Sequence, residues 1–315
     1  MDLKTWGVIY QGGGKLTKLR GVLKGFFGRW VTILFRSWKY QYIFIHREVA
    51  PIGPPVFEWI LSRLFGKKII YDFDDAIWMP DSTVETRLVS WIKCRWKIKY
   101  ICKWSYKISA GNLFLQNYAK QYNANVVIIP TCVDTEVRHN RIKEHKKANL
   151  TIGWTGSHST LRYLEIILPA IINLQQEYNF TFLIISNKPP AFELKNMKFL
   201  QWNEKSEVED LLQMDIGVMP LPDNLWSEGK CGFKLVQYLS LGIPAVAGKA
   251  GVNKEIIGHG VNGFLCESVS EWKEALQKLL TDSSLRKALG LEGRRKIEQE
   301  YSIKSQKAKF LEFFC

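Results

Sequence analysis

Two lysines and two glycines lie close together in the stretch Gly229-Lys230-Cys231-Gly232-Phe233-Lys234. Lys230 and Lys234 are four residues apart, so they share one face of a helix that begins early in this stretch. Glycines allow close approach to the backbone, and lysines at a helix start oppose the dipole unless an anion lies nearby. The stretch predicts a diphosphate site; a solvated charged turn is the alternative.

A second candidate anion site is the turn Thr155–Thr160, which reads Thr-Gly-Ser-His-Ser-Thr. It follows the apolar run Leu150–Trp154 and precedes a helix expected from about Leu161 to Tyr178. A strand that passes through Gly156 and small hydroxyl residues into a helix start directs backbone N–H groups at an anion. A plain N-capped turn is the alternative.

These residues need elements that position them, and the sequence alternates short apolar runs with amphipathic helical stretches. The expected strands are Tyr42–His46, Lys68–Tyr71, Val126–Ile129, Leu150–Trp154, Phe180–Ile185, Lys198–Gln201, Ile216–Met219, Ala245–Ala247 and Gly263–Leu265. The expected helices are 51–65, 161–178, 207–213, 233–241, 252–257, 270–280 and 284–300. This rhythm predicts an α/β fold with parallel sheets covered by helices on both faces, and ligands beyond the carboxyl ends of the strands.

The positive charge of the chain is confined to its first half. The net charge is +14, and residues 1–150 hold 25 basic and 11 acidic residues, whereas residues 151–315 hold 19 of each. Such a field is typical of a domain that faces an anionic partner. There is no run of 18 apolar residues, no signal-peptide pattern and no CxxC among the six cysteines, so we expect reduced thiols and no spanning helix.

Basic and aromatic residues are interleaved in two segments of this half. Between Arg87 and Lys107 there are seven basic residues and no acid, and Lys15 to Lys39 is a second cluster with aromatic residues. Spacing by four predicts a cationic helical ridge formed by Arg95, Lys99, Lys103 and Lys107. This pattern favours an anionic membrane surface. A solvated face over core aromatics is the alternative, and a nucleic-acid partner is not expected because no nucleic-acid-binding signature occurs.

Several motifs resemble those of family 4 glycosyltransferases, which have the GT-B fold. IPTCVD at Ile129–Asp134 resembles the IPNGVD segment of that family, and IGWTGSHST resembles its glycine-rich first strand and loop. GKCGFKLVQYLSLGIPAVA resembles the motif in which two glutamates flank seven residues before GxPVVA. IFIHREVAPIGPP and IIYDFDDAIW resemble a subgroup that acts in bacterial surface polysaccharide assembly.

The resemblance implies two Rossmann-like domains facing a cleft, with a C-terminal helix that crosses back to the N-terminal domain. We expect an acceptor- and membrane-facing domain at 1–136, a linker at 137–149, a nucleotide-sugar-binding domain at 150–300 and the crossover helix at 301–315. The early position of YIFIHRE predicts that the first strand–helix unit is missing. The alternative is a degenerate first unit, with Gly7–Tyr10 as a weak strand followed by Gly12–Gly14. The implied reaction is hexosyl transfer that retains configuration and requires no metal or cofactor.

The resemblance also assigns the donor site. The two glutamate positions fall on Gly229 and Gln237, and Gln237 can still hydrogen-bond the ribose hydroxyls. Lys234 and Arg162 are expected to bind the diphosphate and to stabilise its charge as the glycosidic bond breaks. The remaining expected donor contacts are Gly156, Ser157 and Lys230.

The acceptor side is expected at the ends of two strands. His46, Arg47 and Glu48 directly follow one strand, and Asp72, Asp74 and Asp75 end the next. His46 can hydrogen-bond the sugar or the acceptor, or serve as a buried structural histidine. For the aspartates, helix capping and pairing with nearby cations is the main reading, and contact of one, Asp74 or Asp75, with the acceptor is the other.

We therefore predict a cytoplasmic enzyme that is peripheral on the inner face of the cell membrane. Its expected partners are a nucleotide-sugar donor, a lipid-linked or glycan acceptor and an anionic membrane surface. Gly229 and Gln237 also motivate an alternative, a non-catalytic homologue that binds nucleotide sugar or membrane.

Overall fold

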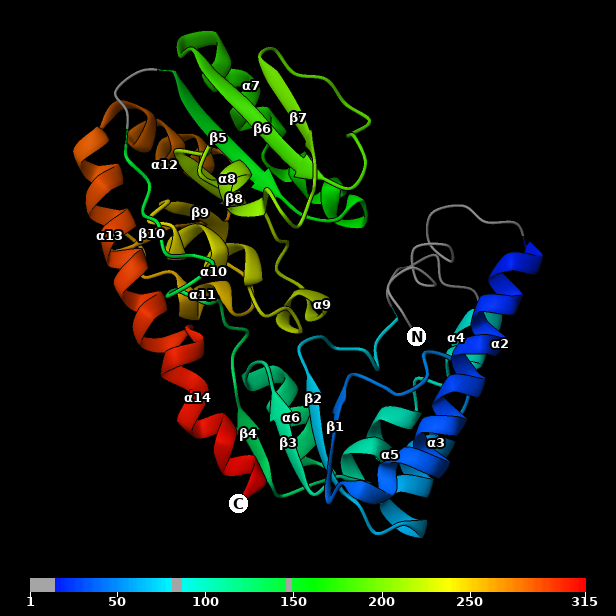
Figure 1. The fold of residues 1–315 in the computed structure, drawn as a ribbon. Coiled ribbons are helices and arrows are strands. Elements are labelled where there is room, and N and C mark those ends of the chain that lie inside the picture. Colours follow the sequence, from blue (N-terminus) through cyan, green and yellow to red (C-terminus); the bar gives the residue numbers. More distant parts are fainter. Residues whose placement is uncertain (1–14, 81–86, 146–148) are drawn as a thin grey trace. The chain divides into compact units, whose positions relative to one another are not determined.

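The computed structural model describes residues 15–80, 87–145 and 149–315. The chain divides into two compact units (Figure 1). The first comprises residues up to Ile128 together with Phe313–Cys315, and the second comprises Ile129–Glu312. No helix among the described residues is long and apolar enough to cross a membrane.

The first unit is built on a parallel four-stranded sheet with the order β1-β2-β3-β4. The strands are β1 Tyr42–His46, β2 Lys68–Phe73, β3 Lys107–Ala110 and β4 Val126–Ile128. The register pairs His46, the last residue of β1, with Asp72 of β2. The carboxyl ends of these two strands therefore meet at one edge of the sheet, where the predicted acceptor residues begin.

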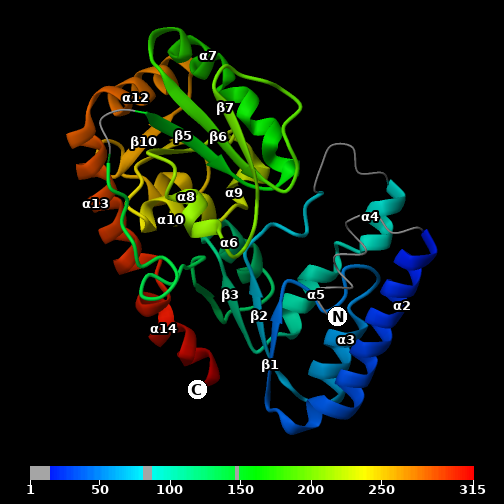
Figure 2. The ribbon, with the colours of Figure 1, turned by 45° about the horizontal axis from the view of Figure 1, so that its top comes forward.

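Helices of the first unit cover this sheet. They are α2 Lys15–Val31, η1 Thr32–Arg36, η2 Ser37–Lys39, α3 Val56–Trp59, η3 Ile60–Leu64, α4 Arg87–Lys93, α5 Lys97–Trp104 and α6 Leu113–Lys120. The segments α2, η1 and η2 follow one another without a break, and α2 lies outside α3 in two views (Figures 1 and 2). The Phe57 ring of α3 contacts Phe26 and Trp30 of α2, with centroids 5.9 and 5.0 Å apart.

The predicted four-residue helical ridge is wrong. Helix α5 begins at Lys97, and Arg95 lies in the turn before it. The helix ends at Ser105, whose backbone is extended, and Lys107 begins strand β3. Of the four residues, only Lys99 and Lys103 therefore share a helical face. Strand β3, which begins at Lys107 and ends the helical spacing, is not predicted from the sequence.

The second unit has a parallel six-stranded sheet with the order β10-β9-β8-β5-β6-β7. The strands are β5 Leu150–Thr155, β6 Phe180–Ser186, β7 Met197–Gln201, β8 Ile216–Met219, β9 Ala245–Gly248 and β10 Gly263–Cys266. The helices are η4 His158–Ile166, α7 Leu168–Glu177, α8 Glu207–Leu211, α9 Leu225–Glu228, α10 Phe233–Ser240, α11 Asn253–Ile256, α12 Val269–Thr281, α13 Ser283–Glu300 and α14 Ile303–Leu311, followed by η5 Glu312–Phe314. The predicted α/β class, with parallel strands and helices, is confirmed.

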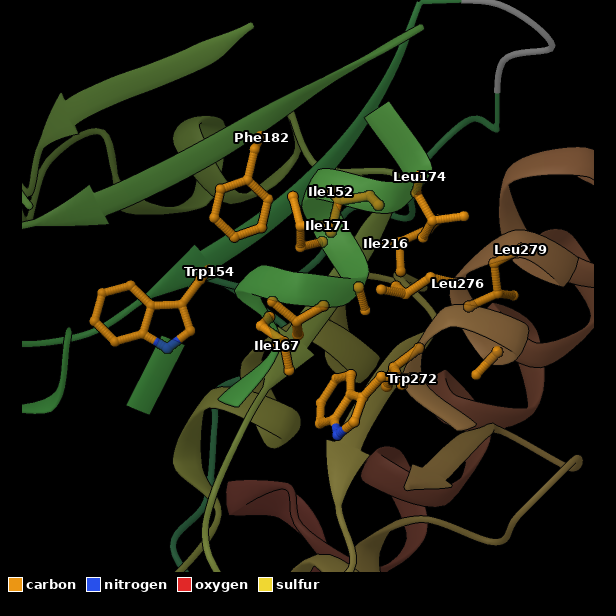
Figure 3. Packing of buried hydrophobic residues seen from close by; sticks show 14 of the residues in the cluster. Ile152, Trp154, Ile167, Ile171, Leu174, Phe182, Ile216, Trp272, Leu276 and Leu279 are labelled. Carbon is orange, nitrogen blue, oxygen red and sulfur yellow. The ribbon is translucent and has the colours of Figure 1, made fainter. Parts of the chain in front are cut away.

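Alternate residues of the strands enter two hydrophobic clusters. Phe182 and Ile184 of β6 lie with α7 and α12 in one cluster, which is shown in Figure 3. Leu183 and Ile185 lie in the other cluster, with α10 and α13. Because successive side chains of a strand point to opposite faces, each apolar run supplies both layers. Strand β5 contributes Leu150, Ile152 and Trp154 to the first cluster, and on its other face Met214 of the second cluster packs against Gly153.

The helix predicted from Leu161 to Tyr178 is two elements. A 3₁₀ helix, η4, precedes the α-helix α7, and the junction lies at Ile167–Leu168. Pro169 has no N–H to donate, which favours it in the first turn of a helix and excludes it from a helix interior. The break between η4 and α7 is therefore explained by Pro169, which the prediction from apolar periodicity did not take into account.

The stretch predicted as a linker is packed on the second unit over much of its length. Arg138 and Arg141 form ion pairs with Glu207 and Glu209 of α8, at 2.7 and 2.5 Å. Lys143 pairs with the buried Asp215 at 3.1 Å and donates to the carbonyl of Leu212. Residues 146–148 of that stretch, and Gly7–Tyr10 and Gly12–Gly14, lie outside the described residues.

Candidate functional site

Lys234, Gly156 and Trp154 come together in the second unit. Lys234 lies in the first turn of α10, and its Nζ is 5.3 Å from the centroid of the Trp154 ring of β5. A Cβ atom at Gly156 would lie 2.7 Å from both Lys234 Cε and a carbon of that ring, so only glycine fits there. The lysine therefore passes directly over the end of strand β5.

The ammonium group of Lys234 is poorly solvated. Burial lowers its pKa to about 8, and the like charge of Lys230 adds to this effect. Within the described ranges of the chain, the structure records no carboxylate paired with Lys234. A desolvated cation without a counterion is costly by itself and becomes favourable when an anion binds. The arrangement is suited to a diphosphate.

Helix α10 presents two further predicted residues. Its N-cap is Gly232, in the left-handed conformation with φ of 67°, and this turn leads the chain directly into Lys234. Gln237 lies three residues after Lys234, is 2% exposed, and its Nε2 has no hydrogen-bond partner among the described residues. A buried amide without a partner is unfavourable, so Gln237 is a candidate donor to a bound ligand.

Arg162 and Lys230 are connected through an aromatic pair. The rings of Tyr163 and Trp226 have centroids 5.7 Å apart. Lys230 Nζ lies 3.7 Å from the Trp226 centroid, and the Arg162 guanidinium lies over Tyr163 and donates to its hydroxyl at 3.1 Å. Two cations from separate elements therefore rest on one aromatic surface, whose aromatic members the motif analysis missed.

The turn after β5 uses several of its own N–H groups. Gly156 N–H donates to the carbonyl of Ile185, and His158 N–H donates to Asn187 Oδ1 at 2.7 Å. Ser157 Oγ lies 2.9 Å from Ser159 Oγ. These bonds fix the turn and occupy some of the backbone donors that the sequence indicated for an anion.

The first expected glutamate position, Gly229, ends helix α9. The carboxylate stands one residue earlier: Glu228 Oε1 accepts from the N–H of Gly251 at 3.3 Å and lies 3.6 Å from Lys254 Nζ. Sequence reasoning passed over Glu228 because the motif spacing points at Gly229. Its bonds hold α9 against the loop that follows β9.

In the first unit, the structure joins His46, Arg47 and Asp74 with Asp72, another of the aspartates named at the strand end. His46 Nδ1 lies 2.7 Å from Asp72 Oδ2, and this hydrogen bond, together with the nearby Asp74 charge, raises the pKa of His46 despite its partial burial. Arg47 donates to Asp74 Oδ1 from Nε and Nη2, at 2.9 and 2.8 Å. The half-exposed imidazole is thus oriented by Asp72 at Nδ1, and its Nε2 lies 3.9 Å from Asp74 Oδ1.

Glu48 and Asp75, two further predicted acceptor-side residues, have contacts with the protein itself. Glu48 forms a 2.7 Å ion pair with the buried Lys97, which also donates to the carbonyl of Ala50. Asp75 Oδ1 accepts from the N–H of Ala76. Within the part of the chain that the structure describes, no group of three or more His, Cys, Asp or Glu residues is arranged to hold a metal ion.

A comparison with protein families finds a match within the second unit. Residues 149–282 match the family model described as glycosyl transferases group 1. The matched segment is similar to glycosyl transferases of group 1 and contains Lys234, Gly156, Arg162 and Gln237.

A short stretch also matches a curated relative. The chain is 37% identical over 60 residues to the human alpha-1,3/1,6-mannosyltransferase ALG2, which is 19% of this chain and 14% of that protein. The match therefore spans about a seventh of the length of that relative.

Solved structures with the same fold cover almost the whole chain. Anabaena HepE in complex with UDP and glucose has a TM-score of 0.68 at 17% identity, covering 96% of this chain and 83% of that one. Sucrose-phosphate synthase from Thermosynechococcus elongatus has a TM-score of 0.66 at 12% identity, covering 94% and 77%. Together with the two parallel sheets, this likeness confirms the expected GT-B fold.

Proposed function

We propose that the chain is a hexosyltransferase that moves a sugar from a nucleotide-sugar donor to a lipid-linked or polysaccharide acceptor. The observation that carries this proposal is the desolvated Lys234 over Gly156 and Trp154 within the segment that matches group 1 glycosyl transferases. The proposal includes retention of anomeric configuration, no requirement for a metal ion, a role in bacterial surface polysaccharide assembly, and a position on the cytoplasmic face of the membrane.

The chemistry follows from the charge that develops on the donor. When the glycosidic bond breaks, the diphosphate gains negative charge, and a preorganised ammonium stabilises it more strongly in a dry site than in water. Lys234 supplies that charge, with Lys230 and Arg162 as outer cations. Gln237 donates to the ribose, which satisfies its buried amide.

The ligands and activities named for the similar proteins indicate the first donors to test. HepE was solved with UDP and glucose and with UDP-glucose, and the human relative is a mannosyltransferase. UDP-hexoses and GDP-mannose therefore head the panel. We expect one of them to be hydrolysed slowly in water and transferred faster to alkyl glycosides, which stand in for the acceptor.

A non-catalytic homologue is the second candidate, and Gly229 and Gln237 favour it because neither is the carboxylate of the resembled motif. The same panel separates the two functions when binding is measured by calorimetry and turnover by nucleotide release. Binding with neither hydrolysis nor transfer supports the homologue, whereas binding with release supports the enzyme.

Donor affinity should fall with rising pH. The Lys234 ammonium, with a pKa of about 8 in the free protein, is required to attract the diphosphate, and a bound anion raises that pKa. Binding above pH 8 therefore takes up a proton, and the Kd for UDP should rise up to about tenfold per pH unit. Calorimetry at several pH values, in buffers of different ionisation enthalpy, measures both quantities. An unchanged Kd from pH 7 to 9.5 contradicts this role for Lys234.

Acceptor use should depend on the His46–Asp72 pair. Replacing His46 with alanine removes a hydroxyl-binding nitrogen, and Asp72→Asn removes the carboxylate that orients the ring. We expect either change to lower transfer to alkyl glycosides roughly 10- to 100-fold. The Kd for UDP should stay the same, because the candidate donor ligands lie in the second unit. Equal transfer by the wild type and both variants would place the acceptor elsewhere.

A further inference from the structure

Five apolar side chains form an exposed stripe along the outer helix of the first unit. Leu23, Phe27, Trp30, Leu34 and Trp38 follow one another at intervals of three or four residues across α2, η1 and η2, with exposed fractions of 60, 71, 36, 39 and 61%. This spacing places them on one face. We call this set the α2 stripe. Phe35, 74% exposed, lies next to it.

The opposite face of the same helix is bound to the unit. Phe26 packs its ring against Phe57, and Ile33 and Ser37 are buried. Arg29 donates to the carbonyl of Gly25 at 3.0 Å and to the carbonyl of Val49. The inner face therefore explains the position of the helix, and two stripe members add to it through the ring contacts of Trp30 with Phe57 and of Trp38 with Phe65. Leu23 and Phe27 remain 60 and 71% exposed.

Cations surround the α2 stripe. From Lys15 to Lys39 the sequence has seven basic residues and no acid, and the first acidic residue after Asp2 is Glu48. Arg20, Lys24, Arg36 and Lys39 are all exposed. An apolar face with a cationic border is typical of helices that lie in the plane of an anionic bilayer.

Helix α4 also carries exposed apolar side chains. It lies beside the N-terminal part of α2 in both ribbon views (Figures 1 and 2), and its Trp91 and Ile92 are 77% and 40% exposed. Tryptophan is enriched at the membrane interface because its ring is amphipathic. A monomer surface with this many large exposed apolar side chains marks an interaction site.

We propose that the α2 stripe inserts into the headgroup region of an anionic lipid bilayer, with the exposed Arg20, Lys24, Arg36 and Lys39 against the lipid phosphates. This inference builds on the membrane association in the proposed function and does not depend on donor binding. It assigns membrane contact to α2, within the Lys15–Lys39 cluster, in place of the ridge of Arg95, Lys99, Lys103 and Lys107 expected from the sequence.

Charge decides between a bilayer and a second copy of the chain. Two α2 stripes packed together would bring both sets of basic residues close to each other without an acidic residue on that helix to offset them. Phosphatidylglycerol headgroups offset the same charges. A bilayer also covers the apolar side chains, which phosphates alone do not.

Helix α2 is hydrogen-bonded to the loop that carries the predicted acceptor residues, so membrane contact by α2 also affects that loop. The Arg29 hydrogen bond to Val49 ties α2 to the loop that follows His46 and Arg47. Glu58 of α3 accepts from the N–H of the same Val49 at 2.9 Å, and burial raises the pKa of Glu58. A bilayer that holds α2 thereby holds the loop on which a lipid-linked acceptor would be bound.

Vesicle flotation of the full chain tests the proposal. Vesicles of phosphatidylcholine alone are compared with vesicles that also contain phosphatidylglycerol, at physiological salt. We expect flotation with the anionic vesicles only. Leu23→Ser/Phe27→Ser should weaken binding at least roughly tenfold because two inserted side chains are lost. Arg20→Gln/Lys24→Gln should weaken it roughly 10- to 30-fold, at about fivefold per cation.

Matched variants in the second unit serve as controls. Val261→Ser removes a side chain that is 58% exposed, and Lys188→Gln/Lys195→Gln removes two exposed charges. Both should float like the wild type. Circular dichroism and the Kd for UDP, measured on every variant, report folding and donor binding independently, so loss of UDP binding with intact flotation counts against the proposed function alone.

The proposal is overturned if Leu23→Ser/Phe27→Ser floats like the wild type, or if flotation is independent of phosphatidylglycerol. It is also overturned if ultracentrifugation shows a dimer that the same double substitution dissociates, because the α2 stripe is then an interface between two copies. Binding to duplex DNA that the serine variant retains, in the absence of flotation, would assign the basic border to nucleic acid.

Discussion

Replacing Lys234 with alanine should reduce kcat/KM for the nucleotide-sugar donor by roughly 100- to 1000-fold. The ammonium is the desolvated cation over Gly156, and its removal leaves the developing diphosphate charge without its nearest partner. The loss should be in kcat as well as in KM, because the charge that Lys234 stabilises is greatest in the transition state. Nucleotide release under steady-state conditions measures it.

Two matched changes test whether the effect belongs to this position. Lys230→Ala removes a cation that lies over the ring of Trp226, and the loss should be about tenfold at most. Lys254→Ala removes a surface lysine paired with Glu228 and should be nearly silent. The thermal midpoint of Lys234→Ala should not fall, since a charge is removed from a desolvated place. Equal activities of Lys234→Ala and Lys254→Ala would refute the assignment.

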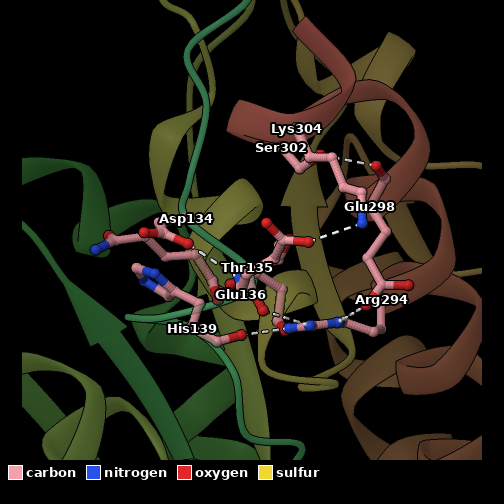
Figure 4. Close-up of polar contacts among 10 residues, drawn as sticks. Asp134, Thr135, Glu136, His139, Arg294, Glu298, Ser302 and Lys304 are labelled. Carbon is pink, nitrogen blue, oxygen red and sulfur yellow. Dashed lines mark hydrogen bonds and ion pairs between the residues drawn. The ribbon is translucent and has the colours of Figure 1, made fainter. Parts of the chain in front are cut away.

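Replacing Arg294 with alanine should have the largest effect on stability, lowering the free energy of unfolding by about 3–5 kcal/mol. Arg294 of α13 is 8% exposed and donates to three backbone carbonyls, those of Thr135, His139 and Ser240 (Figure 4). Its Nε also contacts Glu298 at 2.6 Å. Alanine leaves the carbonyls buried without a donor. Denaturant unfolding followed by circular dichroism measures the change.

Arg295 supplies the control because it is the next residue on the same helix. Its guanidinium is exposed and forms an i,i+3 pair with Glu292 at 2.7 Å. Arg295→Ala should change the free energy of unfolding by no more than about 0.5 kcal/mol. If both alanine variants unfold at the same denaturant concentration as the wild type, the three carbonyls are satisfied in another way, and Arg294 does not fasten residues 135–139 to α13.

Much of the second unit could be predicted from sequence because its signals are local. Strand β5 and the following Gly156 are adjacent in the chain, and so are Gly232 and Lys234, so the motif spacing alone indicated where each turn lies. Short apolar runs placed β6, β8, β9 and β10 within a few residues. Pro169 divided one expected helix, which periodicity alone does not show.

Other features depend on contacts between distant residues. The bond between His46 and Asp72 follows from the register of β1 and β2, 26 residues apart in sequence. Tyr163 and Trp226 meet only when η4 and α9 are placed on the same sheet edge. Spacing offered no signal for either pair, although both sets of residues follow strand ends, where parallel sheets gather their ligands.

In the basic half, the sequence showed which segments carry the positive charge but not which of these residues share a face in the structure. The sequence indicated that Arg95, Lys99, Lys103 and Lys107 form one face, but Lys107 belongs to β3. Lys97, in the same run, is buried and paired with Glu48. The sequence indicated Lys15–Lys39 as a basic and aromatic cluster, but it did not show which of its apolar residues are exposed, because the five residues of the α2 stripe have the spacing of a core face.

Calorimetric titration of the full chain with UDP at pH 7, in parallel with Lys234→Ala, tests the central claim most directly. The account predicts that the wild type binds one equivalent per chain, and that the alanine variant binds at least roughly tenfold more weakly while remaining folded. A wild type that binds neither UDP nor any other nucleoside diphosphate, or a Lys234→Ala variant with the same Kd as the wild type, would contradict it.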